Sequence, residues 1–204
     1  MDSIIIKWFL ISLIFFFLVG TIIPMVFVKK KGKDPHGTHL NASILTRLSL
    51  ISILMWDIYL ILFLLIDDII GNFLALKFLN QDFLIIFGMI LVFISSVFEI
   101  LGMTTLGENF RIELPKEETE LITRGIYRIM RNPIVFGVFL ILVGSFFMIP
   151  TIPFLIICVF NVITFNSKVK DEEKFLIKKF GEKYLKYKQE VGRYCPYIFL
   201  NKKK

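Results

Sequence analysis

The sequence has few of the residues that build metal sites and disulfide frameworks. It contains two cysteines and two histidines among 204 residues. Cys158 lies in an apolar run and Cys195 lies near the C-terminus, a spacing that predicts neither a disulfide nor a thiolate metal site. His36 and His39 share one loop, and two ligands do not complete a metal site. We therefore expect a protein whose chemistry needs no bound metal.

Charged residues are sparse in several long stretches of the chain. Hydrophobic residues make up 56% of it, which is more apolar surface than a soluble domain of this size can bury. Runs that reach membrane-spanning length cover residues 4–28, 44–66, 83–106 and 134–165. The last run contains Pro150 and Pro153, and because proline ends helices, it predicts a tight helical hairpin. The sequence thus predicts an all-α integral membrane protein with about five transmembrane helices and a cytoplasmic or interfacial helical tail.

Basic residues gather on one side of this predicted topology. With the N-terminus outside, 22 of the 24 lysines and arginines lie near the first loop, in the polar segment 107–133 or in the tail. Only Lys7 and Lys77 fall on the opposite side. This asymmetry is the positive-inside pattern and places the tail in the cytoplasm. The net charge of +7 then reflects contact with anionic lipid headgroups, not nucleic acid.

Two polar segments meet at this cytoplasmic face. The first ends in "RGIYRIMRNP" and the second begins "NSKVKDEEK". A two-arm hairpin joins them, so it should return Glu172 and Glu173 close to Arg131. Basic and acidic groups would then flank a pocket walled by apolar helices. Such a pocket could hold a polar cofactor while a lipid approaches from the bilayer.

Simpler interpretations of the same residues stay open. Arg124, Arg128 and Arg131 could anchor a membrane helix at the interface. The acids of the "DEE" run could stabilise the N-terminus of a cytoplasmic helix. In the tail, apolar residues recur at spacings of three and four, which favours an amphipathic helix that lies on the membrane and is interrupted near Gly181. These residues are Leu176, Phe180, Tyr184, Tyr187 and Val191.

Two acids, Asp57 and Glu99, lie inside predicted spans. A charge in lipid is costly, so each should face a partner or a wet cavity. Glu99 lies about two turns before the polar segment and could line the pocket. Alternatively, these acids form structural pairs with a residue such as Arg47 or Tyr59.

The polar segments together resemble a known family. "LGENFRIELPKEETELITRGIYRIMRNPIVFG", a hairpin and then "DEEKFLIKKFGEKYLKYKQEVGRYCP" are similar to the isoprenylcysteine carboxyl methyltransferase family, which is related to the phospholipid methyltransferases. The resemblance covers about residues 105–197. It implies S-adenosylmethionine as methyl donor and a lipid or prenylated substrate that enters from the bilayer. Within a single membrane domain, 1–204, residues 1–104 would hold the N-terminal spans and residues 105–204 the methyltransferase-like half.

Carried over residue by residue, the resemblance implies a donor site and two catalytic residues. Lys168 stands where family members often carry an arginine that holds the substrate carboxylate, and Glu173 is the second acid of the motif. Asn132 replaces a histidine of the best-studied members, and Val135 replaces an aromatic residue. The changes at Lys168 and Val135 leave the substrate class open. The donor-site residues are Leu121, Ile122, Tyr127, Arg131, Asn132, Pro133 and Glu172.

The chemistry separates the functions that this resemblance allows. A carboxylate that attacks a sulfonium methyl group needs no base, and a water-poor pocket helps it. An amine must lose a proton and needs a base such as Glu172 or Glu173. Our leading hypothesis is methylation of the carboxylate of an isoprenylated cysteine or a similar lipid-linked acid. The alternatives are a phospholipid amine methyltransferase, an NADPH-dependent enzyme like the sterol reductases, and a non-catalytic scaffold.

Overall fold

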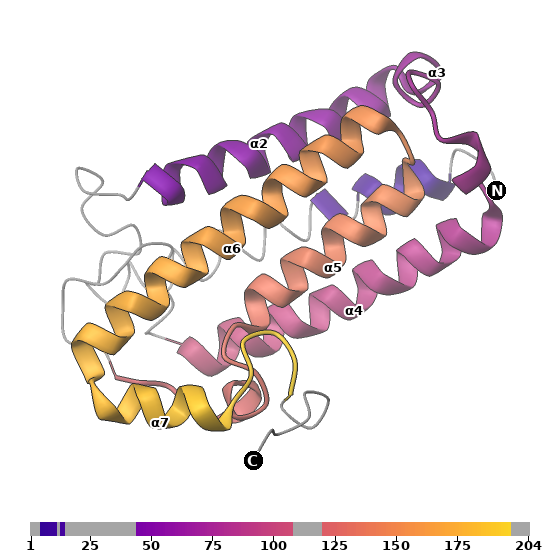
Figure 1. Cartoon of the computed structure of the whole chain (residues 1–204). Helices are drawn as coiled ribbons and strands as arrows, with labels where there is room; N and C mark the ends of the chain where they lie inside the picture. The colour runs from indigo at the N-terminus through magenta and orange to yellow at the C-terminus, as the bar shows by residue number, and fades with distance from the viewer. Residues whose placement is uncertain (1–4, 12, 15–43, 108–119, 197–204) are drawn as a thin grey trace.

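The computed structural model describes residues 5–11, 13–14, 44–107 and 120–196 (Figure 1). Its named elements in the described part are all helical. They are α2 (Ile44–Leu65), α3 (Asp67–Ile70), η2 (Lys77–Leu79), α4 (Asp82–Leu106), η4 (Gly125–Arg128), α5 (Pro133–Met148), α6 (Ile152–Phe180) and α7 (Glu182–Glu190). Residues 5–11 and 13–14 are helical too, but most of the predicted first span lies outside the described residues.

Three of the described helices, α2, α4 and α6, are long and apolar enough to cross a membrane. Large apolar side chains such as Phe93, with 71% of its surface exposed, point away from the helix contacts, as expected for a lipid-facing surface. The all-α membrane class is therefore confirmed. The predicted spans 44–66 and 83–106 match α2 and α4 to within one residue at each end. The total of five helices stays a prediction.

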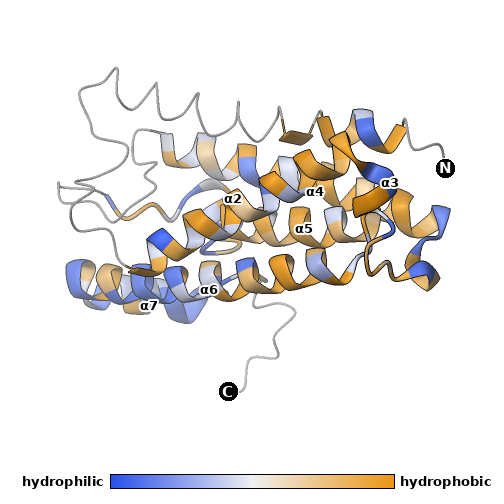
Figure 2. Ribbon diagram, turned by 90° about the horizontal axis from the view of Figure 1, so that it is seen from above, coloured by the Kyte–Doolittle hydropathy of each residue, from blue (hydrophilic) through white to orange (hydrophobic). Residues whose placement is uncertain are grey.

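The hairpin turns where the sequence predicts it. α5 has 16 residues and ends at Met148, Pro150 lies in the turn, and α6 begins at Ile152. The second arm differs from the prediction because it does not end near residue 165. α6 has 29 residues and is about 44 Å long, which exceeds a hydrocarbon core of about 30 Å. Its polar half therefore continues past the membrane (Figure 2).

α6 ends at Gly181, whose φ of +52° is left-handed and suits a residue without a Cβ atom. After this glycine the chain turns into α7, which crosses the end of the helical bundle (Figure 1). The interruption predicted near Gly181 is thus confirmed.

Small and polar residues hold the long helices in two pairs. α4 packs on α5, and a Cβ atom added to Gly88 would lie only 2.5 Å from the Gly144 carbonyl oxygen. Glycine at both positions permits this close approach. α2 packs on α6, where the Asn161 Nδ2 donates a hydrogen bond of 2.9 Å to the Ser52 carbonyl oxygen. The contacts within each pair fix where α5 begins and where the polar half of α6 emerges.

At the end of the bundle opposite α7, the link between α2 and α4 is fastened to the hairpin turn. The Leu76 N–H donates to the Pro150 carbonyl oxygen at 2.8 Å, and the Ile152 N–H donates to the Leu74 carbonyl oxygen at 3.1 Å. The turn of the hairpin is therefore held, so the arms deliver Arg131 and the polar half of α6 to the same end of the molecule (Figure 1).

Candidate functional site

Three segments form the candidate site: the entrance to α5, the polar half of α6, and residues 191–194, which we call the C-terminal strap. The strap runs beside the entrance to α5 as an isolated parallel bridge between Met130 and Gly192. The Arg131 N–H donates to the Gly192 carbonyl oxygen at 2.9 Å, and the Asn132 N–H donates to the Arg193 carbonyl oxygen at 3.0 Å. The backbone therefore places Arg131 and Arg193 side by side.

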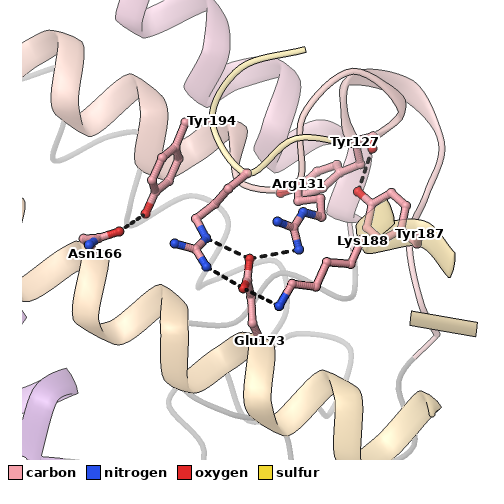
Figure 3. A network of polar contacts seen from close by, with 8 residues as sticks. Tyr127, Arg131, Asn166, Glu173, Tyr187, Lys188 and Tyr194 are labelled. Carbon is pink, nitrogen blue, oxygen red and sulfur yellow. Dashed lines mark hydrogen bonds and ion pairs between the residues drawn. The ribbon is translucent and has the colours of Figure 1, made fainter. Parts of the chain in front are cut away.

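Glu173 of α6 lies between these two arginines and Lys188 (Figure 3). Arg193 donates two hydrogen bonds to the carboxylate, from Nε to Oε1 at 2.9 Å and from Nη2 to Oε2 at 2.7 Å. Arg131 Nη1 lies 3.0 Å from Oε1, and Lys188 Nζ lies 3.6 Å from Oε2. The side chains of Arg131 and Glu173 are each only 5% exposed. Three cations thus surround one buried carboxylate, and the cluster carries excess positive charge.

Arg131 keeps unused hydrogen-bonding capacity in this cluster. Its Nε atom is buried and makes no hydrogen bond to a residue that the structure describes, whereas Nη1 forms the ion pair with Glu173. Buried donors of a guanidinium are costly to leave unpaired. The arrangement can therefore accept a further anionic or hydrogen-bond-accepting group at Arg131.

Burial and the charges of the cluster together shift the pKa values of the ionisable groups around it. The hydrogen bond to Glu173 raises the pKa of Arg193 above its usual range. Burial raises the pKa of Tyr184 to about 12, while the charge of Arg131 acts in the opposite direction. Burial also raises the pKa of Tyr194 to about 12. These phenols stay neutral near pH 7, so they serve as hydrogen-bonding groups and not as bases.

Tyrosines fix the segments around the cluster. The Tyr187 hydroxyl donates to the Tyr127 carbonyl oxygen at 2.6 Å, which ties α7 to η4. The Tyr194 hydroxyl donates to Asn166 Oδ1 at 3.1 Å, and its ring meets the Phe139 ring edge to face. The strap therefore contacts both arms of the hairpin, and Figure 3 shows its bond to the second arm at Asn166.

The remaining residues predicted for the donor site lie between residue 121 and the start of α5. Leu121 packs against the buried cluster that α7 forms, and Ile122 is half-buried. Tyr127 is buried in η4. Pro133 is the first residue of α5, and Asn132 is its N-cap, without a side-chain capping bond.

Of the predicted acids and the predicted lysine, Glu173 alone contacts Arg131. Lys168 Nζ lies 3.6 Å from Glu172 Oε1, one helical turn away on α6. The Glu172 side chain is 33% exposed. Burial raises the pKa of Tyr127, and the charges of Tyr187 and then Glu172 raise it further. The predicted meeting of the two motifs is thus present, through Glu173 and not through Glu172.

The apolar face of the tail helix differs from the sequence prediction of membrane contact. Tyr184, Tyr187 and Val191 are buried against Leu121 and the last turns of α6. The break at Gly181 lets the face fold back onto the protein, where it covers the segment before η4.

Sequence reasoning missed Arg193, Lys188 and Tyr194. The only local signal was a lone arginine beside a tyrosine in "GRYCP". A single cation in a lysine-rich tail predicts no particular partner.

The chain matches a family model described as phospholipid methyltransferase over residues 83–183. A protein-S-isoprenylcysteine O-methyltransferase of Saccharomyces cerevisiae is 31% identical over 117 residues, which cover 55% of this chain and 49% of the yeast protein. A probable protein-S-isoprenylcysteine O-methyltransferase of Oryza sativa subsp. indica is 33% identical over 120 residues, or 54% of this chain and 60% of the rice protein. A protein-S-isoprenylcysteine O-methyltransferase of Xenopus laevis is 30% identical over 118 residues, which cover 55% of this chain and 41% of the Xenopus protein.

These alignments thus span about half the length of the curated relatives. The matched region contains α4 from its second residue, the entrance to α5, the hairpin and the "DEEK" acids, and it ends before Lys188 and the strap. Over residues 83–183, about half of its length, the chain is therefore similar to the phospholipid methyltransferase family and to protein-S-isoprenylcysteine O-methyltransferases.

Proposed function

We propose that the chain is a membrane-embedded, S-adenosylmethionine-dependent methyltransferase that methylates the carboxylate of an isoprenylated cysteine or a similar lipid-linked acid. The observation that carries this proposal is the buried cluster in which Glu173 joins Arg131 of the first motif to Arg193 of the strap. The similarity to phospholipid methyltransferases supports the reaction class, and the activity named for the relatives supports the acceptor.

The residues at the cluster fit the methyl donor. The Nε atom of Arg131, which has no partner among the described residues, suits the carboxylate of S-adenosylmethionine, because charge-assisted hydrogen bonds to a guanidinium are strong. The Asn132 side chain makes no capping bond and can add a polar contact. Glu172 can accept from the donor's ammonium or ribose hydroxyls. Leu121 and Ile122 supply apolar contact on the η4 side, with Tyr127 and Pro133 beside them.

We assign different roles to the two residues predicted as catalytic. Lys168 carries the cation that orients the acceptor carboxylate, and Glu172, 3.6 Å away, limits where its ammonium can lie. Glu173 acts as a positioning residue for Arg131, since both of its oxygens already pair with cations. A carboxylate held by three cations is a weak base.

The reaction itself needs positioning more than acid–base chemistry. One oxygen of the acceptor carboxylate forms a bond to the methyl carbon while the carbon–sulfur bond breaks. The products are a neutral ester and a neutral thioether, and no proton is transferred. Opposite charges cancel in this step, so a water-poor site with an oriented acceptor favours it.

The proposed orientation in the membrane has the N-terminus outside and the tail in the cytoplasm. Exposed lysines on the outer face of the polar half of α6 and on α7 would then meet anionic lipid headgroups. These exposed residues are Lys170, Lys174, Lys178, Lys179, Lys183 and Lys186.

A phospholipid amine is the second candidate acceptor, because the matching family model is described as phospholipid methyltransferase. An amine acceptor must lose a proton, and Glu172, which is one-third exposed, is the acid placed to take it.

Calorimetric binding of S-adenosylmethionine to the detergent-purified chain tests the donor site. We expect Arg131→Ala and Glu172→Ala to weaken binding about tenfold to hundredfold, the effect of losing one charge-assisted hydrogen bond. Arg128→Ala is the matched control, because Arg128 lies in the same segment and is exposed. Arg131→Lys keeps a cation beside Glu173 and guards against misfolding, which thermal unfolding checks. No binding by the folded wild-type chain would refute the donor site.

Transfer of labelled methyl groups then identifies the acceptor. We expect label in N-acetyl-S-farnesylcysteine and none in phosphatidylethanolamine. The reverse result would establish the phospholipid amine instead. Donor binding without transfer to either acceptor would favour the non-catalytic scaffold, and binding of NADPH in place of the donor would favour the reductase hypothesis.

A further inference from the structure

Glu99 is a buried acid that the proposed reaction does not yet use. It lies in α4, in the stripe of buried residues that faces α5, and is only 4% exposed. Its Oε1 atom is fully covered and accepts no hydrogen bond from any residue that the structure describes. A carboxyl group in a membrane-spanning helix is costly unless it has a partner. Glu99 therefore lacks a group that would justify its position.

The surrounding residues that the structure describes make room for Oε1 without donating a hydrogen bond to it. A Cβ atom added to Gly137 of α5 would lie 2.8 Å from Glu99 Cγ and 3.3 Å from Oε1. The glycine thus leaves the space that the acid occupies. Nearby hydroxyls do not serve Glu99, since Ser95 and Ser96 both donate to the Val92 carbonyl oxygen, at 2.7 and 3.1 Å. Oε1 can therefore accept a hydrogen bond from a ligand without losing one to a described residue.

Glu99 lies close to the candidate site, on its membrane side. One turn farther along α4, Gly102 packs on Pro133 and Ile134, at the entrance to α5. Gly137, which contacts Glu99, is four residues beyond Pro133, or about 6 Å deeper along α5. An acceptor that enters from the bilayer approaches the cluster from this direction. The carboxyl group is thus placed for the methyl acceptor and not for the methyl donor at Arg131.

Resting on the proposed function, we infer that the Glu99 carboxyl group binds an N–H group of the lipid-linked acceptor. An isoprenylated cysteine in peptide linkage carries an amide N–H on the same carbon as its carboxylate. That N–H loses its hydrogen bond to water when the methyl acceptor enters an apolar site. It then needs a hydrogen-bond acceptor from the protein. A carboxyl oxygen is a strong hydrogen-bond acceptor. The ammonium of a phospholipid amine presents the same N–H chemistry.

Two pairs of ligands separate this role from a structural one. N-acetyl-S-farnesylcysteine and S-farnesyl-3-mercaptopropionate differ by the acetamido group and therefore by the N–H. Phosphatidylethanolamine and phosphatidylcholine differ in the N–H groups of the amine. Equilibrium binding of each ligand is measured for the wild-type chain, Glu99→Leu and Glu99→Gln. Thr104→Val is the control, because Thr104 lies on α4, is exposed and bonds within its own helix.

We expect Glu99→Leu to weaken binding of the N–H-bearing member of one pair about tenfold to hundredfold. Binding of the other member should change less than about twofold, because it makes no such bond. Glu99→Gln, which keeps one acceptor oxygen, should recover part of the loss. A difference within the first pair would identify the amide N–H of an isoprenylated cysteine as the ligand. A difference within the second pair would identify the ammonium of a phospholipid.

Three outcomes would overturn the inference. Equal losses for both members of each pair would make Glu99 structural, and unchanged binding throughout would make it irrelevant to the acceptor. Weaker binding of S-adenosylmethionine by Glu99→Leu would assign it to the donor site. A different result would refute the proposed function: the wild-type chain binds the methyl donor and the acceptors but transfers no methyl group. In that case the binding differences still decide the role of Glu99.

Discussion

Arg193 is the residue whose removal tests the charged cluster most directly. Arg193→Ala removes both hydrogen bonds from its guanidinium to Glu173. In the wild-type structure the Glu173 side chain is 5% exposed and also lies close to Arg131 and Lys188. The carboxylate of the variant therefore still has two cations as partners. Full removal of a buried partner costs about 3–5 kcal/mol. Because Arg193 is itself 29% exposed and two cations remain, we expect a smaller loss of about 2 kcal/mol in the free energy of unfolding.

The same substitution should weaken binding of the methyl donor. Arg193 and Arg131 share the Oε1 atom of Glu173, so loss of one partner lets the carboxylate move and with it the guanidinium of Arg131. A misplaced guanidinium loses part of a charge-assisted hydrogen bond. We expect S-adenosylmethionine to bind about threefold to tenfold more weakly, less than the loss for Arg131→Ala, because Arg193 acts through another residue.

Thermal unfolding in detergent and calorimetric binding measure the two effects. A loss of about 2 kcal/mol corresponds to a fall of about 4–8 °C in the unfolding temperature for a chain of this length. Arg193→Lys keeps a cation but not the paired hydrogen bonds, so it should recover part of the stability. Lys186→Ala on α7 is the control, because Lys186 is exposed. If Arg193→Ala matched Lys186→Ala in both measurements, the cluster would not hold Arg131.

Three further substitutions test the fold around the site. Gly144→Leu should lower the unfolding temperature strongly, because a Cβ atom there would lie 2.6 Å from the Gly88 carbonyl oxygen; a smaller effect than that of Gly144→Ala would contradict the close contact. Tyr187→Phe removes the bond to the Tyr127 carbonyl oxygen and should cost about 1 kcal/mol in unfolding experiments, with an unchanged value counting against the α7 contact. Asn161→Leu removes two hydrogen bonds to Ser52 across α2 and α6 and should cost about 0.6–1.7 kcal/mol per bond in detergent unfolding; a stabilised variant would show that these bonds are not needed.

Much of the membrane fold could be predicted because its signals are local. The apolar runs that form α2 and α4 are bordered by polar or charged residues, which predict where the two helices begin and end. Pro150 marked the hairpin turn, and Gly181 marked the end of α6. The end of the second arm was predicted too early, because the change from apolar to charged residues near Asn166 marks where the membrane ends and not where the helix ends.

The partners within the site were harder to predict. The hairpin brought the motifs together as expected, but which acid meets Arg131 depends on the rotation of α6 about its axis. Glu172 and Glu173 point about 100° apart on a helix, and the sequence does not fix that rotation. The strap left no local signal either, since its bonds to Arg131 and Asn132 join segments far apart in the chain.

The strap also explains how the first motif keeps its side chains available. Helix N-termini are commonly capped by the side chain of the N-cap residue, and Asn is well suited to that role. Here the Asn132 side chain makes no capping bond, and the carbonyl groups of the strap accept the N–H groups that lead into α5. The strap's backbone therefore fixes the entrance to the helix, and Arg193 fixes Glu173 from the same segment. The side chains of Arg131 and Asn132 are positioned by bonds that leave donors free, which is the arrangement that a ligand-binding motif requires.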